Sequence, residues 1–256
     1  MGQTDRPRQR QSQRKETKTV ADTVTGALRD VAFSCSASLF GTACFKDCED
    51  LVPRSIPFSI RDLPYSVSVG FRLSDPVMDG LVDRPTRTYQ YHYRQVNLLI
   101  DHTLLRMLGK LHELGYEGFP VPSSQIVDWE AGTGHLAHKV VASVAGLGWL
   151  GRNNLLVSPL YGARVRYGSL FTNAPLRLTA QVRETPGRPG AAGRSECGSC
   201  FACVSACPAG AIGKSRADFD LEKCRQTLKN FERSENIGSM ICGLCVKACR
   251  GAKRRS

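Results

Sequence analysis

Eight cysteines between residues 197 and 249 stand at spacings that suit metal chemistry. They read Cys197-x2-Cys200-x2-Cys203-x3-Cys207-Pro208, then Cys224, then Cys242-x2-Cys245-x3-Cys249. A C-x2-C-x2-C loop wraps three thiolates around one face of an iron–sulfur cubane, and the fourth cysteine, followed by proline, reaches the other cluster. Eight ligands of this kind predict two 4Fe–4S clusters.

The crossing of the fourth cysteine predicts which ligands share a cluster. One group is Cys197, Cys200, Cys203 and Cys249, and the other is Cys207, Cys224, Cys242 and Cys245. Cys224 is the irregular member, because it stands in for the third cysteine of an incomplete second C-x2-C-x2-C loop. The alternative is zinc, since tetrahedral four-cysteine sites also use C-x2-C pairs. The unbroken C-x2-C-x2-C-x3-C-P run favours iron–sulfur.

Three further cysteines, Cys35, Cys44 and Cys48, precede these groups. Without a fourth thiol or a nearby histidine they make a poor metal site, so we interpret them as buried or incidental. The N-terminus is basic and polar with no apolar segment behind the charges, which is not the pattern of a secretory signal. We therefore expect the protein in the cytoplasm, where closely spaced cysteines favour metal over disulfides.

Composition and charge narrow the class of protein. The 256 residues are 41% hydrophobic and 23% charged. No apolar run approaches the roughly 20 residues of a membrane span, so we expect no membrane partner. The net charge is +12, of which +4 comes from residues 1–18 and +4 from the basic residues after Cys249. Basic ends of this kind hold nucleic-acid backbones by counterion release, or are simply solvated.

Hydrophobic periodicity predicts the elements that must position this chemistry. Apolar residues alternate from Val67 to Leu73, as in a half-buried strand, and residues 38–44 are expected to form a neighbouring strand. An apolar stripe from Tyr91 to Leu114 predicts a long helix that ends at Gly115.

A second helix is expected from about His135 to Ala145, where small residues allow close packing, with Gly146 at its end. The sequence "GLGWLGRNN" then turns into strands at 155–158 and 163–172. Strands and helices in this order predict an α+β fold. The expected domains are a disordered tail at 1–20, the α+β domain at 21–178, a linker at 179–196 and a cysteine domain with a basic tail at 197–256.

Polar residues in the α+β domain are candidates for cofactor binding and proton transfer. Tyr91 and His92 lie at the start of the long helix, where they contact a cofactor or merely pack. Lys139 binds a phosphate or a carboxamide, or is a solvated helix lysine. The candidate proton donors are Asp128, Glu130, His135 and His138.

Several segments together resemble a known family. These are "HKVVASVAGLGWLGRNNLLVSPLYGARVRYGSLFTNAPL", "CGSCFACVSACPAGAI", "LEKCRQTL" and "CGLCVKAC". Over about residues 60–250 the chain is similar to the epoxyqueuosine reductases and their shorter relatives. The resemblance implies a nitroreductase-like cobalamin-binding domain, shared with reductive dehalogenases, followed by a ferredoxin-like double 4Fe–4S domain. It implies electrons reaching a corrinoid that removes the epoxide oxygen from a queuosine precursor in tRNA.

The resemblance also assigns residues. It places the corrin near Gly146, Gly148, Trp149, Gly151, Arg152 and Asn153, since glycines let backbone approach a flat ring closely. The aspartate that acts as general acid in the family falls at Gly132, so Asp128 or Glu130 replaces it only if the loop shifts. The chain also lacks the additional C-terminal helical region of longer relatives, and Arg250 follows the last cysteine where the family has proline.

One enzyme hypothesis and two alternatives follow. We expect a cytoplasmic, monomeric oxidoreductase that takes electrons from an external low-potential donor and uses two 4Fe–4S clusters and cobalamin, with tRNA as a partner in queuosine biosynthesis. One alternative keeps the cofactors and reduces a small molecule, as reductive dehalogenases do, and the missing aspartate and extension favour it. The other is a non-catalytic electron carrier whose N-terminal domain docks a partner.

Overall fold

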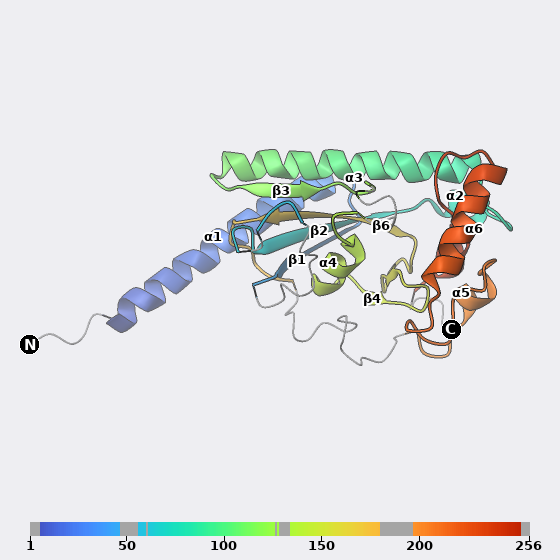
Figure 1. Ribbon diagram of the computed structural model, residues 1–256. Helices are drawn as coiled ribbons and strands as arrows, with labels where there is room; N and C mark the ends of the chain where they lie inside the picture. Colours follow the sequence, from blue (N-terminus) through green and yellow to red (C-terminus); the bar gives the residue numbers. More distant parts are fainter. Residues whose placement is uncertain are drawn as a thin grey trace, which may run out of the picture.

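A four-stranded antiparallel sheet organises the N-terminal region (Figure 1). The computed structural model describes residues 6–46, 56–59, 61–125, 127, 134–179 and 197–251. The strands lie in the order β1 (Leu39–Cys44), β2 (Tyr65–Arg72), β6 (Val165–Thr172) and β3 (Gly118–Val121). Val67 of β2 pairs with Thr42 of β1 and Leu170 of β6. The strands that periodicity predicted at 38–44, at Val67 to Leu73 and at 163–172 are confirmed as β1, β2 and β6.

Helices α1 (Arg6–Ser34) and α3 (Arg87–Glu113) cover one face of the sheet. The apolar stripe predicted for α3 is confirmed in the middle of the helix, where Ile100, Leu104 and Met107 are fully buried. The helix begins before the predicted Tyr91, because the hydroxyl of Thr86 accepts a hydrogen bond from the backbone N–H of Tyr89 and caps it. It ends before Gly115, whose φ is +80°.

Helix α4 (His138–Val144) covers the opposite face of the sheet, so β2 is buried on both faces rather than half-buried as predicted. The residues of β2 on the α4 side are small, namely Ser66, Ser68 and Gly70. The end of α4 comes so near to the sheet that a Cβ atom on Gly41 would lie 2.8 Å from the carbonyl oxygen of Ala145. The close packing expected from small residues is therefore confirmed.

Two helices begin at positions that the sequence did not indicate. Helix α1 begins at Arg6, within residues 1–20, for which a disordered tail was predicted, and Pro7 stands in its first turn, where proline is tolerated. Helix α4 begins at His138, so His135 lies before it. Most of the predicted linker, residues 180–196, lies outside the described residues. Within the described ranges no helix has the length and apolar character of a membrane span.

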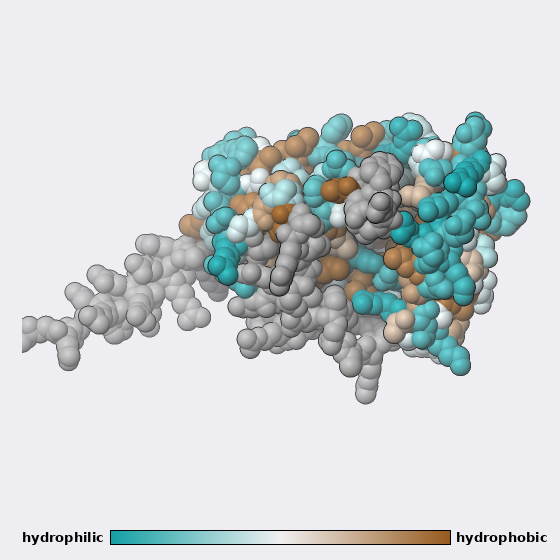
Figure 2. Space-filling model, viewed as in Figure 1, coloured by the Kyte–Doolittle hydropathy of each residue, from teal (hydrophilic) through white to brown (hydrophobic). Residues whose placement is uncertain are grey.

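The cysteine-bearing region consists of loops and the helices α5 (Ala202–Ser205), α6 (Leu221–Ser234) and α7 (Leu244–Ala248). Helix α7 packs against α5 and against the short helix α2 (Asp75–Asp79) of the N-terminal region. The buried guanidinium of Arg164 bonds to the carboxylates of Asp75 and Asp79 and to the carbonyl of Lys247, which ties the two regions together. The surface over α6 is hydrophilic (Figure 2), and α6 has no fully buried residue.

Candidate iron–sulfur site and adjoining cavity

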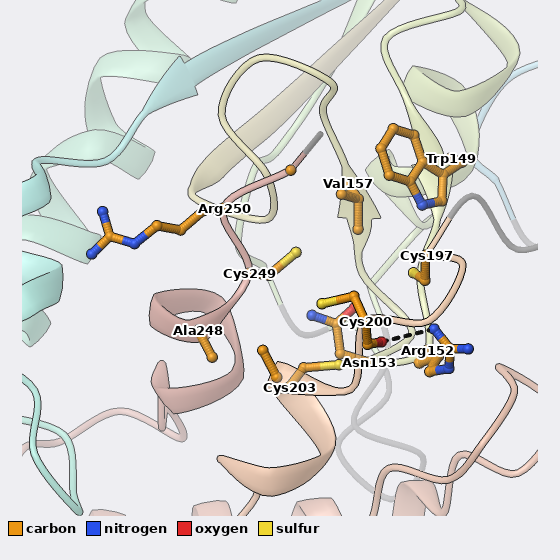
Figure 3. A pocket seen from close by; sticks show the side chains of 12 residues that line it. Trp149, Arg152, Asn153, Val157, Cys197, Cys200, Cys203, Ala248, Cys249 and Arg250 are labelled. Carbon is orange, nitrogen blue, oxygen red and sulfur yellow. Dashed lines mark hydrogen bonds between the residues drawn. The ribbon is translucent and has the colours of Figure 1, made fainter. Parts of the chain in front are cut away.

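The eight cysteines gather into the two groups that their spacing predicted. We name the group of Cys197, Cys200, Cys203 and Cys249 set A, and the group of Cys207, Cys224, Cys242 and Cys245 set C. Set A lines a cavity of about 230 Å³, cavity A, and set C lines a cavity of about 220 Å³, cavity C. Figure 3 shows three cysteines of set A on one side of cavity A and Cys249 reaching in from another segment.

Turns and helix ends aim the cysteines of set A. The backbone N–H of Cys200 donates to the carbonyl of Cys197 across Gly198, whose φ of +50° suits glycine. Cys203 lies within α5, and Cys249 is the residue directly after α7. The loop, the short helix and the far helix end therefore present their thiols to one cavity.

Set C depends on the starts of two helices. The carboxylate of Asp220 accepts a hydrogen bond from the N–H of Lys223, which caps α6 and places Cys224 in its first turns. Gly243, with a φ of +83°, begins α7 between Cys242 and Cys245. Helix capping thus supplies the position of the cysteine that the sequence pattern left irregular.

The cysteine groups are wider than a site for one ion. Among the described residues, no three His, Cys, Asp or Glu side chains converge closely enough to hold a single metal ion. A tetrahedral zinc site needs four thiolates within about 2.3 Å of the metal, whereas a cubane separates the thiolates by its own width.

Burial raises the pKa of five of these thiols, which disfavours their thiolate form when no metal is bound. Together with a contribution from neighbouring cysteines, burial raises the pKa of Cys203 to about 11. Burial likewise raises the pKa of Cys224, Cys242, Cys245 and Cys249. The thiolate is the form that binds a metal, and a positively charged metal centre would lower these pKa values.

The glycine-rich segment forms the hairpin β4 (Trp149–Leu150) and β5 (Leu156–Val157), whose turn contacts set A. Arg152 is 7% exposed, and its three donor nitrogens bind the carbonyls of Gly198 at 2.8 Å, Cys200 at 2.9 Å and Lys214 at 2.6 Å. Its guanidinium also lies 4.3 Å from the ring centroid of Phe201. Arg152, for which the resemblance implied a place near a corrin, thus holds the loop of set A.

The glycines of this segment serve the hairpin itself. A Cβ atom on Gly148 would lie 2.1 Å from the carbonyl oxygen of Val157, and one on Gly151 would lie 2.7 Å from the Val157 side chain. Gly146 has a φ of +76° directly after α4. The close backbone approach that the sequence indicated is therefore present, but it is made to the partner strand.

A third cavity, cavity B, of about 270 Å³, lies beside set C. Lys139 and Leu155 line both cavity B and cavity C, and Asn153 lines both cavity C and cavity A. Cavity C therefore adjoins both cavity A and cavity B. The polar residues of cavity B are Tyr89, Ser123, His138, Lys139, Arg166 and Tyr167.

Two residues of cavity B have perturbed acid–base properties. Burial lowers the pKa of Lys139 to about 8, and the Lys139 ammonium donates to the carbonyl of Asn154 at 2.8 Å. Burial raises the pKa of Tyr167, whose hydroxyl is buried and has no hydrogen-bond partner among the described residues. Sequence reasoning missed Tyr167, because a tyrosine in an alternating strand reads as a packing residue.

The remaining predicted site residues are more scattered. His138 accepts from the Ser169 hydroxyl at 3.0 Å and donates to the carbonyl of Pro122 at 3.0 Å, and burial lowers its pKa. His135 lies before α4, so the two histidines do not share a helix face. Tyr91 is 65% exposed, and the His92 ring accepts from the backbone N–H of Ser74. Neither Tyr91 nor His92 lines cavity A, B or C. Asp128, Glu130 and Gly132 lie outside the described residues.

Two of the other cysteines are away from both sets. Cys35 is buried and accepts a contact from the guanidinium of Arg106 at 3.1 Å, and Cys44 is half-buried at the end of β1. Cys48 lies outside the described residues.

The size of cavity B limits what it can hold in this conformation. Pockets for drug-sized ligands measure about 300–1,000 Å³, and a corrinoid is larger than such ligands. Cavity B is smaller than that range, so its residues do not fit a whole corrinoid as they stand. Arg166 bonds to the hydroxyl of Tyr93 and to Asn97, which line a neighbouring open cavity of about 410 Å³.

Comparison with known proteins confirms the resemblance predicted from the residues. No protein-family model matches the chain. Curated proteins named epoxyqueuosine reductase match it at 30–42% identity. The protein of Bacillus anthracis is 32% identical over 158 residues, which cover 58% of this chain and 37% of the relative. The chain thus matches little more than a third of that relative's length.

Solved structures share the fold. A reductive dehalogenase, described as suggesting a mechanism for B12-dependent dehalogenation, matches with a TM-score of 0.66 at 16% identity, over 87% of this chain and 31% of the other. An epoxyqueuosine reductase bound to an epoxyqueuosine-modified tRNA stem loop matches with a TM-score of 0.54 at 19% identity, over 92% of this chain and 67% of the other. The mixed α/β fold is common to all three.

Proposed function

We propose that the protein is an iron–sulfur oxidoreductase of the epoxyqueuosine reductase type, in which sets A and C bind 4Fe–4S clusters and cavity B receives the electron acceptor. The observation that carries the proposal is that cavity C, lined by one group of four cysteines, adjoins both cavity A, lined by the other four, and cavity B, lined by proton-bearing side chains. The clusters supply single electrons when bound. A non-catalytic carrier needs no such cavity beside its clusters, so cavity B supports an enzyme.

The residues of cavity B suit a substrate oxygen. The Tyr167 hydroxyl keeps its proton at neutral pH because burial raises its pKa, so it is available to donate. Lys139, with a pKa of about 8, is mostly charged at pH 7 and favours negative charge on the substrate. Arg166 adds a second cation at the same cavity. Together these groups bind, orient and protonate an oxygen that receives electrons.

The cofactors are tested by chemical analysis of oxygen-free protein. Reconstituted protein is expected to hold about eight irons per chain and to show two reducible centres by electron paramagnetic resonance. Zinc in place of iron would remove the proposal. Incubation with hydroxocobalamin, followed by removal of unbound corrinoid, tests the corrinoid separately. Retained corrinoid with a changed visible spectrum supports it, and lack of retention restricts the proposal to the clusters.

Epoxyqueuosine in tRNA is the substrate that the curated relatives suggest. We expect the chain to restore queuosine to the tRNA of a strain that lacks epoxyqueuosine reductase. The matched control is Cys200→Ala, which removes a ligand of set A and is expected to restore none. Protein that is fully loaded with iron yet restores no queuosine argues against tRNA as the substrate.

A small molecule is the second candidate substrate. The position of the family's aspartate is Gly132, and cavity B, at about 270 Å³, has the size for a small ligand rather than a nucleoside with its backbone. Chemically reduced protein, incubated with a halogenated phenol, would then release halide from the phenol. Halide release without restoration of queuosine selects this candidate, and the reverse result rejects it.

A further inference from the structure

We propose that Trp149 and Asn153 donate hydrogen bonds to sulfur atoms of the cluster at set A and thereby raise its reduction potential. The inference rests on the proposed function, because it requires set A to hold a 4Fe–4S cluster. It concerns residues that the family resemblance placed beside a corrin.

Both side chains are buried donors aimed at cavity A. Trp149 is 4% exposed and Asn153 is 3% exposed. The indole Nε1 of Trp149 and the amide Nδ2 of Asn153 have no hydrogen-bond partner in the part of the chain that the structure describes. Both residues line cavity A with the four cysteines of set A. Figure 3 shows the indole nitrogen on the ring edge nearer to the cysteines.

The burial of these groups requires an acceptor. A buried donor without a partner is destabilising, and native structures leave few such groups. The indole N–H can only donate, and the oxygen of the Asn153 amide already accepts from the backbone N–H of Leu155 at 3.3 Å. Sulfur atoms of a bound cluster are the acceptors that the surrounding cysteines would bring into this cavity.

Arg152 does not compete for this role. Its donors are directed to the carbonyls of Gly198, Cys200 and Lys214, so it holds the loop rather than the cluster. The neighbouring residues of one hairpin turn therefore divide two tasks. Arg152 positions the ligand loop, while Trp149 and Asn153 face the ligands' cavity.

Hydrogen bonds to cluster sulfur stabilise the reduced state, because that state carries more negative charge. Donors therefore raise the reduction potential of the cluster they contact. Trp149 lines cavity A and not cavity C, whereas Asn153 lines both. Removing the Trp149 donor is therefore expected to act on the cluster at set A alone, and the cluster at set C serves as an internal control.

The test is a redox titration of reconstituted full-length protein, followed by electron paramagnetic resonance. The two signals are assigned with Cys200→Ala and Cys207→Ala, each of which removes one ligand from one set. Trp149→Phe keeps an aromatic ring and removes the N–H. We expect it to lower the reduced-to-oxidised ratio of the cluster at set A about tenfold at a fixed potential, a shift of ~59 mV to more negative values for one electron.

Two further variants complete the design. Asn153→Leu removes the second donor and is expected to shift the signal of set A in the same direction. Tyr116→Phe, in a residue packed against the core near the end of α3 remote from the cysteines, is the matched aromatic control and is expected to shift neither signal.

The outcomes separate the inference from the proposed function. Wild-type protein without iron would overturn the proposed function. Wild-type protein with about eight irons, together with an unshifted potential in both donor variants, would overturn the inference and leave the proposed function standing. If Trp149→Phe loses the iron of set A, the potential of Asn153→Leu decides the question, and an unshifted value there also counts against the inference.

Discussion

Sets A and C have the same ligands but different surroundings. Cavity A is lined by Trp149, Arg152, Asn153 and Arg250, which are donors and cations. Cavity C is lined largely by apolar side chains, including Ile212, Phe219, Leu221 and Leu228. The reduction potential of a cluster depends on net charge, hydrogen bonds to sulfur and exposure, so the cluster at set A is expected to have the higher potential.

The two sets also differ in what holds their cysteines. Gly162, in the N-terminal region, contacts the backbone of Cys249, and the N–H of Ala163 donates to the Cys249 carbonyl at 3.2 Å. In set C, Cys224 lies on α6, whose cap comes from Asp220 of the same region. Set A is therefore completed by packing between regions, whereas Cys224 is positioned locally. Packing of the N-terminal region against the last cysteine decides whether set A is complete.

The largest expected effect comes from removing one ligand of each set. Cys200→Ala should halve the iron content, from about eight to about four per chain, and abolish the signal of set A. Cys207→Ala should do the same for set C, because the two cavities have separate ligands. Iron analysis with electron paramagnetic resonance measures both. Loss of all iron in either variant would show that the sets do not fold independently.

A substitution in the N-terminal region should damage set A selectively. A Cβ atom on Gly162 would lie 2.1 Å from the carbonyl oxygen of Cys249, so Gly162→Ala is expected to displace this ligand and lower the iron of set A while set C keeps its own. The matched control is Gly210→Ala. Gly210 also has a positive φ but has no atom within 4 Å of the Cβ position, so only about 1–2 kcal/mol of backbone strain is expected there. Equal iron loss in both variants would contradict this account.

Loss of the hydrogen bonds made by Arg152 should have an intermediate effect. Arg152→Met removes the hydrogen bonds to three carbonyls, and we expect a loss of about 2–3 kcal/mol in the free energy of unfolding, together with faster loss of set A iron to a chelator. Arg84→Met is the control, because Arg84 forms only exposed ion pairs and should change stability by less than about 1 kcal/mol. Chemical denaturation and timed chelation measure these quantities. Equal stability of the two variants would show that Arg152 does not hold the loop of set A.

The smallest expected effect concerns His138, which lines cavity B, and it depends on pH. Burial holds the pKa of His138 below its ordinary value of about 6.5, so near that pH the unfolded state binds a proton that the folded state does not. Stability should therefore fall as pH drops from about 7 through 6.5, by at most ~1.4 kcal/mol per pH unit. His138→Gln should lack this component. If the difference in unfolding free energy between the wild type and His138→Gln stays constant from pH 7.5 to 5.5, His138 does not cause the pH dependence.

Much of the fold could be predicted from local sequence patterns. The alternation from Val67 and the stripe around Ile100 and Leu104 each depend on neighbours within one element, so strand β2 and helix α3 could be predicted. The burial of both faces of β2 could not, because it depends on α4 arriving from another part of the chain. The same reason explains why α4 began at another residue than expected, since a helix end depends on caps and packing as well as on composition.

The grouping of the eight cysteines was determined by the sequence, because a C-x2-C-x2-C-x3-C loop restricts which thiols can reach a common point. Only the tertiary structure decided what surrounds them. Trp149, Arg152 and Asn153 carry the same residue types whether they face a corrin or a cysteine loop, and the fold of the β4–β5 hairpin against residues 197–203 turns them toward set A. Contacts between segments far apart in the chain depend on complementary packing surfaces, which spacing and composition do not encode.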